Sequence, residues 1–99
     1  MLFLSYWELN ENITPKDVAE LAAELMEKKL WPPEGTTILG FYTTTEVPIW
    51  GITIEEAENV ETILKGAAAW TNTKPGIFKV LRVSPAMTAE EAIRVIMEM

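Results

Sequence analysis

Aromatic side chains are the residues in this sequence best able to form a binding site. Four tryptophans and two tyrosines occur among 99 residues. Such side chains build protein cores and interfaces, and they also line pockets that bury apolar ligands. Both interpretations stay open here, a core with a subunit interface or an aromatic-lined pocket. The candidate ligand-binding residues are Tyr6, Trp7, Tyr42, Trp50, Trp70 and Phe78, together with Arg82 as a contact for an anionic group.

Small side chains next to Trp70 mark where space for a ligand could open. The run Gly66-Ala67-Ala68-Ala69 lies on a predicted helix. Small residues on a helix above a sheet either permit close packing or leave a void, and close packing is the commoner use. If a ligand site exists, we expect it to be largely dry and to lie between helices and sheet within each subunit. Leucine at Ala67 or Ala68 should then fill it.

Two basic residues lie on an otherwise apolar segment near the end of the chain. Lys79 and Arg82 have opposite parity, so they point to opposite faces of a strand. Lysine at such a position commonly protects an exposed sheet edge. Arg82 could pair with Glu8 on a neighbouring strand or contact an anionic ligand. Glu8 would act as a general base only if it were buried, and an ion pair or a solvated strand end accounts for it more simply.

Histidine and cysteine are absent from the chain. Their absence excludes zinc sites built from them, cysteine-ligated iron–sulfur clusters, histidine-ligated haem, and catalysis by serine–histidine or cysteine–histidine pairs. The acids Glu55, Glu56, Glu58 and Glu61 open a predicted helix, where capping and the helix dipole account for them without a metal ion. The five glycines form no phosphate-binding loop. We therefore expect neither a metal nor a cofactor.

Composition and charge limit the partners of the chain. With 8 Lys and Arg against 15 Asp and Glu, the net charge of −7 repels the phosphate backbone of nucleic acids. No run approaches the roughly 20 apolar residues of a membrane-spanning helix, and no basic leader is visible. The length of 99 residues suits a single domain, residues 1–99. These observations predict a cytoplasmic protein that binds neither nucleic acid nor membrane.

Three threonines predict the starts of three helices. Thr14, Thr53 and Thr88 each precede an acidic residue by three positions, which is the pattern of a helix N-cap. The spacing of the apolar residues then predicts helices from Pro15 to Lys29, from Glu55 to Ala69 and from Ala89 to Met97.

Four segments rich in β-branched and aromatic residues read as strands. They are Leu2–Leu9, Thr36–Thr44, Pro48–Thr53 and Ile77–Val83. The element order β-α-β-β-α-β-α predicts an α+β fold of the ferredoxin-like type, a split β-α-β arrangement (βαββαβ) with an antiparallel four-stranded sheet. The extra C-terminal helix is an addition to that core.

Both faces of the predicted sheet carry apolar side chains. In the first strand, Leu4 and Tyr6 alternate with Phe3 and Trp7. Two helices cover only one face, so the other would expose a larger apolar area than soluble monomers tolerate. The sequence therefore predicts a homodimer in which the open sheet faces pack together. The alternative is that the last helix folds over the open face, although it is short for that purpose.

Features spread over nearly the whole chain carry a resemblance to a known family. They are Trp7 in the first strand, Pro32-Pro33-Glu34-Gly35, Leu39-Gly40, Gly51, Trp70, Phe78-Lys79-Val80 and Pro85. In these features the chain resembles a family of small bacterial and archaeal proteins of unknown function in the dimeric α/β-barrel superfamily. The resemblance implies two ferredoxin-like subunits whose sheets form a barrel. That superfamily also includes cofactor-independent quinone-forming monooxygenases, lactone isomerases and haem enzymes, but the resemblance transfers no functional residue.

The sequence supports three hypotheses about function. The first is a non-catalytic homodimer that buries a small apolar or aromatic ligand. The second is a cofactor-independent enzyme, monooxygenase- or isomerase-like, that acts on an aromatic substrate. The third is a purely structural interaction module. An enclosed cavity containing a polar group would favour the first two, and a carboxylate or tyrosine with a perturbed pKa beside that cavity would favour the enzyme.

Overall fold

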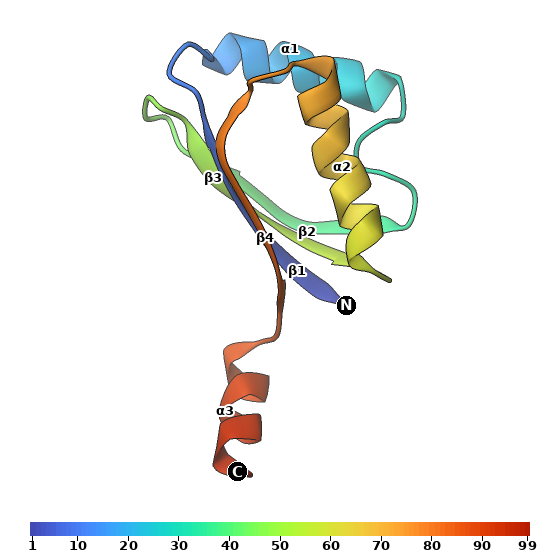
Figure 1. The fold of residues 1–99 in the computed structure, drawn as a ribbon, viewed down its shortest axis with the longest axis vertical. Helices are drawn as coiled ribbons and strands as arrows, with labels where there is room; N and C mark the ends of the chain where they lie inside the picture. Colours follow the sequence, from blue (N-terminus) through green and yellow to red (C-terminus); the bar gives the residue numbers. More distant parts are fainter.

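Four antiparallel strands and three helices alternate along the chain, and the computed structural model describes all of residues 1–99 (Figure 1). The elements are β1 (Leu2–Leu9), α1 (Pro15–Glu27), β2 (Thr36–Thr43), β3 (Trp50–Ala57), α2 (Val60–Thr73), β4 (Phe78–Ala86) and α3 (Ala89–Met97). The strand order across the sheet is β2-β3-β1-β4, and every neighbouring pair is antiparallel. This arrangement confirms the predicted ferredoxin-like α+β fold with an extra C-terminal helix.

Helices α1 and α2 lie on one side of the sheet (Figure 1). Burial alternates along β1 as the pleat of a strand requires, because Phe3 and Trp7 are buried whereas Leu4 and Tyr6 are exposed. The main core lies between the helices and the sheet and contains Trp7, Leu9, Ile13, Leu21, Leu25, Ile49, Trp70 and Ile77. Strands β1 and β3 are neighbours at the centre of the sheet, and β1 contributes Trp7 and Leu9 to that core.

Two of the three predicted N-caps are confirmed. The Thr14 hydroxyl accepts a hydrogen bond from the Asp17 backbone N–H, and the Asp17 carboxylate accepts one from the Thr14 N–H, so α1 begins in a capping box. Thr88 caps α3 by a single bond, in which its hydroxyl accepts from the N–H of Glu91. Helix α1 ends at Glu27, slightly before the predicted end at Lys29, whose φ of 58° is typical of the residue that terminates a helix.

The third predicted N-cap is wrong, because Thr53 lies inside β3 and not at a helix start. β3 continues to Ala57, beyond the predicted end of that strand, since it pairs with β1 on one side and β2 on the other. Those two ladders hold Glu55 in the sheet, although its sequence context resembles the first turn of a helix. Helix α2 begins later, with Asn59 as its N-cap accepting from the Thr62 N–H at 3.0 Å.

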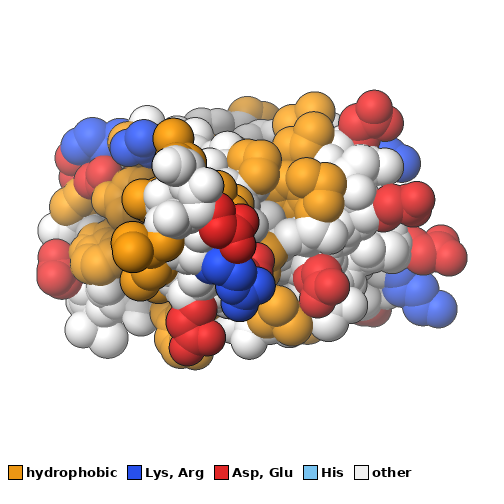
Figure 2. Space-filling model, turned by 90° about the horizontal axis from the view of Figure 1, so that it is seen from below, with side chains coloured by type: hydrophobic (Ala, Val, Ile, Leu, Met, Phe, Trp, Pro, Cys, Tyr) orange, Lys and Arg blue, Asp and Glu red, His pale blue; other side chains and the backbone are white.

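The face of the sheet opposite α1 and α2 is open and carries apolar side chains. Cross-strand pairing places Tyr6 beside Ile52, and Leu4 beside Ile54. The exposed large hydrophobic residues of this face include Leu4, Tyr6, Tyr42 and Ile52. Figure 2, which views the molecule from the α3 end, shows hydrophobic side chains gathered in groups with acidic and basic side chains between them. The prediction of two apolar sheet faces is therefore confirmed.

Helix α3 stands away from the rest of the molecule and leaves the open face uncovered (Figure 1). It has no buried residue, and its apolar side chains Ile93, Val95, Ile96 and Met97 are between 52% and 80% exposed. The alternative in which the last helix folds over the sheet is therefore wrong. None of the helices has both the length and the apolar character needed to cross a membrane.

Candidate functional site

The sheet divides the seven candidate ligand-binding residues into two groups. Trp7, Trp70 and Phe78 lie on the side that the helices cover, where all three line one cavity. The other four, Tyr6, Tyr42, Trp50 and Arg82, lie on the open face. Their position follows from the register, because Tyr6 pairs with Arg82 and Ile52, and Ile52 pairs with Tyr42. Trp50 joins this group through a ring-centroid distance of 6.0 Å to Tyr6.

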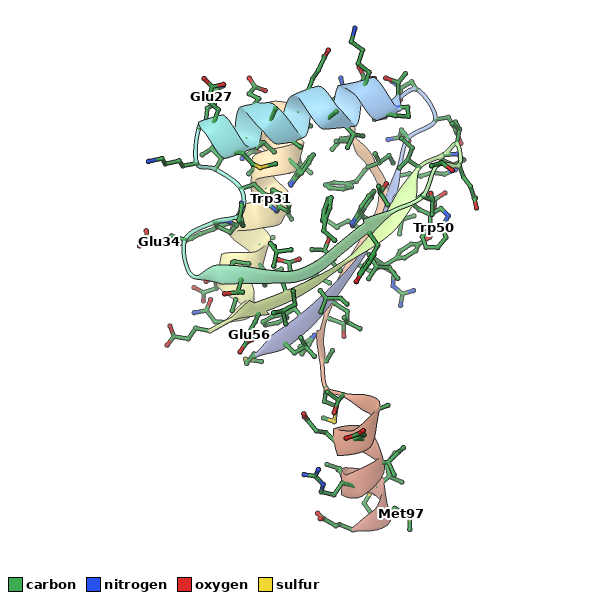
Figure 3. All side chains as sticks on the ribbon, turned by 180° about the vertical axis from the view of Figure 1, so that it is seen from behind. Glu27, Trp31, Glu34, Trp50, Glu56 and Met97 are labelled. Atoms are coloured by element: carbon green, nitrogen blue, oxygen red, sulfur yellow. The ribbon has the colours of Figure 1, made fainter.

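An aromatic cluster fills much of the space between the helices and the sheet. Trp31 packs against Trp70 with ring centroids 5.5 Å apart and against Phe41 at 5.2 Å, and Phe41 stacks on Trp7 at 5.8 Å. Trp31 lies between the helices and the sheet, whereas Trp50 and Glu56 lie on the other side (Figure 3). An apolar cavity of about 40 Å³ remains, lined by Trp7, Leu9, Val18, Phe41, Trp70, Ile77 and Phe78.

A glycine makes the close packing of Trp7 possible. A Cβ atom on Gly51 would lie 2.3 Å from Trp7 Cζ2 and 2.2 Å from the backbone oxygen of Tyr42. Any side chain at this position would displace the indole ring or the neighbouring strand. Glycine therefore lets the indole ring pack closely on β3 and line the cavity.

A second cavity of about 40 Å³ adjoins the first and contains polar groups. Its lining residues are Ser5, Trp31, Glu55, Ile63, Gly66, Ala67, Trp70, Phe78, Leu81 and Val83. Trp70 and Phe78 form the shared wall of the two cavities. We call this second space the Glu55 cavity.

Glu55 is the most unusual residue of the site because its carboxyl group is buried. The residue is 6% exposed, and Ser5 Oγ donates to Glu55 Oε1 at 3.0 Å. The second carboxylate oxygen, Oε2, accepts no hydrogen bond from the protein, and no basic side chain lies within ion-pair distance. Oε2 keeps some contact with solvent, because Thr36 Oγ1 is the one fully buried side-chain polar atom that lacks a partner. Burial raises the pKa of Glu55 above its ordinary value, and the hydrogen bond from Ser5 partly offsets that effect.

The Glu55 cavity adjoins a surface groove between α2 and β4. The two spaces share Ala67, Leu81 and Val83. The groove measures about 330 Å³ and is lined by Val60, Glu61, Leu64, Ala67, Leu81 and Val83. Five of these six residues are hydrophobic. A small molecule in the groove could therefore reach the buried carboxylate with one end.

The small residues of α2 have separate roles. Gly66 permits close packing, because a Cβ there would lie 3.3 Å from Pro33 Cδ and 3.4 Å from Trp31 Cδ1. Ala67 lines both the Glu55 cavity and the groove. Ala68 lines a different hollow with Lys29 and other residues of the segment after α1. The expectation that either alanine borders the candidate site therefore holds for Ala67 and is wrong for Ala68.

The two basic residues of β4 differ in their contacts. Lys79 lies on an edge strand of the sheet and forms an ion pair with Glu11 at 3.0 Å. That pairing raises the pKa of Lys79. Arg82 forms no ion pair with Glu8, and it lies on the open face away from the Glu55 cavity. No group of three or more acidic side chains is placed to hold a metal ion.

Three buried polar residues of the site escape prediction from the sequence, namely Ser5, Thr53 and Glu55. All three lie on the strand face that meets the helices, where apolar residues are the rule. A signal for two of them exists, because Thr53 and Glu55 alternate with Ile52 and Ile54 at the period of a strand. The capping pattern at Thr53 competes with that alternation and conceals it.

The fold and the site together define a small α+β protein with a buried carboxylate in an aromatic pocket. The chain belongs to the family described as Domain of unknown function (DUF3303), whose model matches residues 1–99. A search of the curated proteins finds no match. The predicted resemblance to a family of unknown function is confirmed, and membership of the dimeric α/β-barrel superfamily stays a prediction.

Proposed function

We propose that the protein is a ligand-binding homodimer in which each subunit takes a small, mostly apolar molecule between α2 and the sheet. The observation that carries this proposal is the buried residue Glu55, which lines an aromatic cavity beside an apolar groove. Burying an ionisable group in apolar surroundings costs free energy. Ionisable groups whose pKa values are shifted by burial occur often at functional sites. Binding a ligand is one role that such a group can have.

The dimensions of the two spaces support a ligand that lies mainly in the groove. The Glu55 cavity of about 40 Å³ has room for a few water-sized groups. The groove of about 330 Å³ reaches the lower end of the range of small-molecule sites, about 300–1,000 Å³. A molecule with a body in the groove and a small polar end in the cavity fits this shape.

The exposed surface supports the dimer. The single chain exposes 6788 Å², whereas a folded monomer of this mass exposes about 5,700 Å². The excess of about 1,100 Å² is somewhat larger than the roughly 800 Å² that each partner contributes to a standard interface. Leu4, Tyr6 and Ile52 on the open face supply an apolar surface suited to a second copy. Helix α3, which has no buried residue, would pack on that copy with its exposed apolar side chains.

One observation favours an enzyme as the second candidate function. Burial raises the pKa of Glu55, and a raised pKa is the direction of shift that suits a carboxyl group acting in proton transfer. A cofactor-independent enzyme acting on an aromatic substrate would use Glu55 for this purpose. Turnover of a bound aromatic compound that stops in the Glu55→Gln variant while binding persists would establish this candidate over the binding protein.

A ligand screen with two matched variants tests the proposed function. Small hydrophobic aromatic compounds are titrated into the protein while tryptophan fluorescence is followed, since Trp31 and Trp70 line the cavity. The Ala67→Leu variant should lose binding because the new side chain fills the space, and the Ala68→Leu variant should retain it. Light scattering should report the same dimer for both variants. Failure of every compound to bind, or equal binding by the two variants, would contradict the proposal.

A further inference from the structure

The unpaired oxygen of Glu55 indicates the chemical class of the ligand. Resting on the proposed function, we infer that the ligand is an organic cation, a primary amine on an aromatic or alkyl body, whose ammonium group binds Glu55 Oε2. The apolar body then lies in the groove between α2 and β4. Ser5 already donates to Oε1, so the carboxylate is held in position before the ligand arrives.

The hydrogen-bonding state of Glu55 leaves one place for a donor. A carboxylate has several acceptor positions, and Glu55 uses one oxygen for Ser5 and neither for a cation. Oε2 is left to the little solvent that reaches it, and an ammonium group that replaces this solvent supplies both the opposite charge and up to three N–H donors. A neutral apolar ligand would leave this carboxylate unpaired.

The walls of the Glu55 cavity suit a cation as well. Trp31 and Trp70 both line it, with their rings in an edge-to-face arrangement at 5.5 Å. Indole rings attract ammonium groups through the negative potential above their faces. The aromatic walls therefore provide a second source of attraction for an amine that is bound to Glu55.

The charges around the groove disfavour anionic ligands. No lysine or arginine lines the cavity or the groove, and Glu61 lies on the groove wall. The whole chain carries a net charge of −7. A field of this sign attracts organic cations and repels carboxylates. Arg82, which could have served an anion, lies on the other face of the sheet.

Four compounds of nearly equal size test the inference: benzylamine, benzyl alcohol, toluene and benzoate. Each compound is titrated into the intact protein, and its binding is followed by tryptophan fluorescence. Calorimetry measures the same affinities independently. Benzylamine should bind at least about tenfold more tightly than toluene, because a hydrogen bond to a charged group adds that much when it is desolvated. The affinity of benzyl alcohol should lie between those of benzylamine and toluene, and benzoate should not bind.

The Glu55→Gln variant removes the charge and keeps an acceptor for Ser5. In this variant the advantage of benzylamine over toluene should disappear. The matched control is Glu56→Gln, which removes the same charge from the next residue of β3 on the opposite face of the sheet and should leave the advantage unchanged. Circular dichroism of both variants confirms that the fold is retained.

The outcomes separate the inference from the proposed function on which it rests. If toluene and benzylamine bind equally well, or if Glu55→Gln keeps the preference for the amine, the cation site is wrong and the apolar ligand site stands. Tighter binding of benzoate would overturn the cation site in the same way. If none of the four compounds binds, the proposed function fails together with the inference.

Discussion

The indole N–H of Trp7 donates to the hydroxyl oxygen of Thr53 at 3.1 Å and so connects β1 to β3 on the face that the helices cover. Both residues are buried, with exposures of 6% and 4%. A buried N–H group needs an acceptor, because it has lost its contact with water. This bond fixes the direction of the indole ring that lines the first cavity, and the short Thr53 side chain leaves room for it.

Replacing the Thr53 hydroxyl tests this connection directly. The Thr53→Val variant keeps the shape of the side chain and leaves the Trp7 N–H without an acceptor, so the free energy of unfolding should fall by about 1–3 kcal/mol. The Thr53→Ser variant retains the acceptor, so its free energy of unfolding should fall by less. Urea unfolding followed by circular dichroism measures both. Equal losses in the two variants would show that packing of the threonine methyl group, not the hydrogen bond, is the important contact.

Two carboxyl groups should give the stability opposite dependences on pH. Burial raises the pKa of Glu55 above its ordinary 4.5, so the folded state binds this proton more tightly than the unfolded state. Its contribution is fully present below pH 4.5 and is lost as the pH rises through the raised pKa. The Glu55→Gln variant should therefore gain stability relative to the original protein as the pH rises from 4 to about 7.

Asp17 provides the contrasting case. Hydrogen bonds from the backbone and side chain of Thr14 hold the pKa of Asp17 below its ordinary 3.8. Its contribution is present above pH 3.8 and is lost as the pH falls through the lowered pKa. The Asp17→Asn variant should thus be less stable than the original protein at neutral pH, with the difference shrinking in acid. Urea unfolding between pH 3 and about 7 checks both variants, and parallel pH profiles would contradict the assigned shifts.

The order of the elements and the apolar side chains on both faces of the sheet could be predicted from the sequence, because the capping and alternation patterns of most segments agree. Thr14 and Thr88 precede helices that no competing strand pairing disturbs, and both caps are confirmed. Around Thr53 two signals compete, and pairing with β1 and β2 prevails over the capping pattern. The site was only partly predictable for the same reason. Glu55 becomes a buried carboxylate only once it is known to lie in a strand, and burial depends on tertiary packing.

A single charge on the open face should separate the subunits of the proposed dimer. Light scattering of the original protein should report about 22 kDa, twice the 11.1 kDa of one chain. The Ile52→Lys variant places an ammonium group at the centre of the apolar face and should shift the mass to that of one chain. Met26→Lys on α1, at a site 53% exposed, is the matched control and should remain dimeric. A monomeric original protein would refute the dimer.

The caps of α1 and α3 should differ in their effect on stability, although a threonine hydroxyl accepts a backbone hydrogen bond in both. Thr14→Ala removes the cap of a helix that packs on the core, and it should lower the free energy of unfolding by about 1 kcal/mol. Thr88→Ala removes the cap of a helix with no buried residue, so the unfolding of the core should change by less than about 0.5 kcal/mol in the dilute, monomeric protein. Tryptophan fluorescence during thermal unfolding measures the core in both variants.

In the proposed dimer, the isolation of α3 would make its helical content depend on association. Nine residues form this helix, and isolated helices shorter than about 12–15 residues are marginal in water. Because α3 buries no residue in its own chain, its order in the proposed dimer would come from contacts with the second copy, and that ordering would draw on the free energy of association. The far-ultraviolet helix signal should consequently fall on dilution in step with dissociation. A chain ending at Ala86 should lack this change. The C-terminal segment of the intact chain would then report the subunit concentration through its own helix signal.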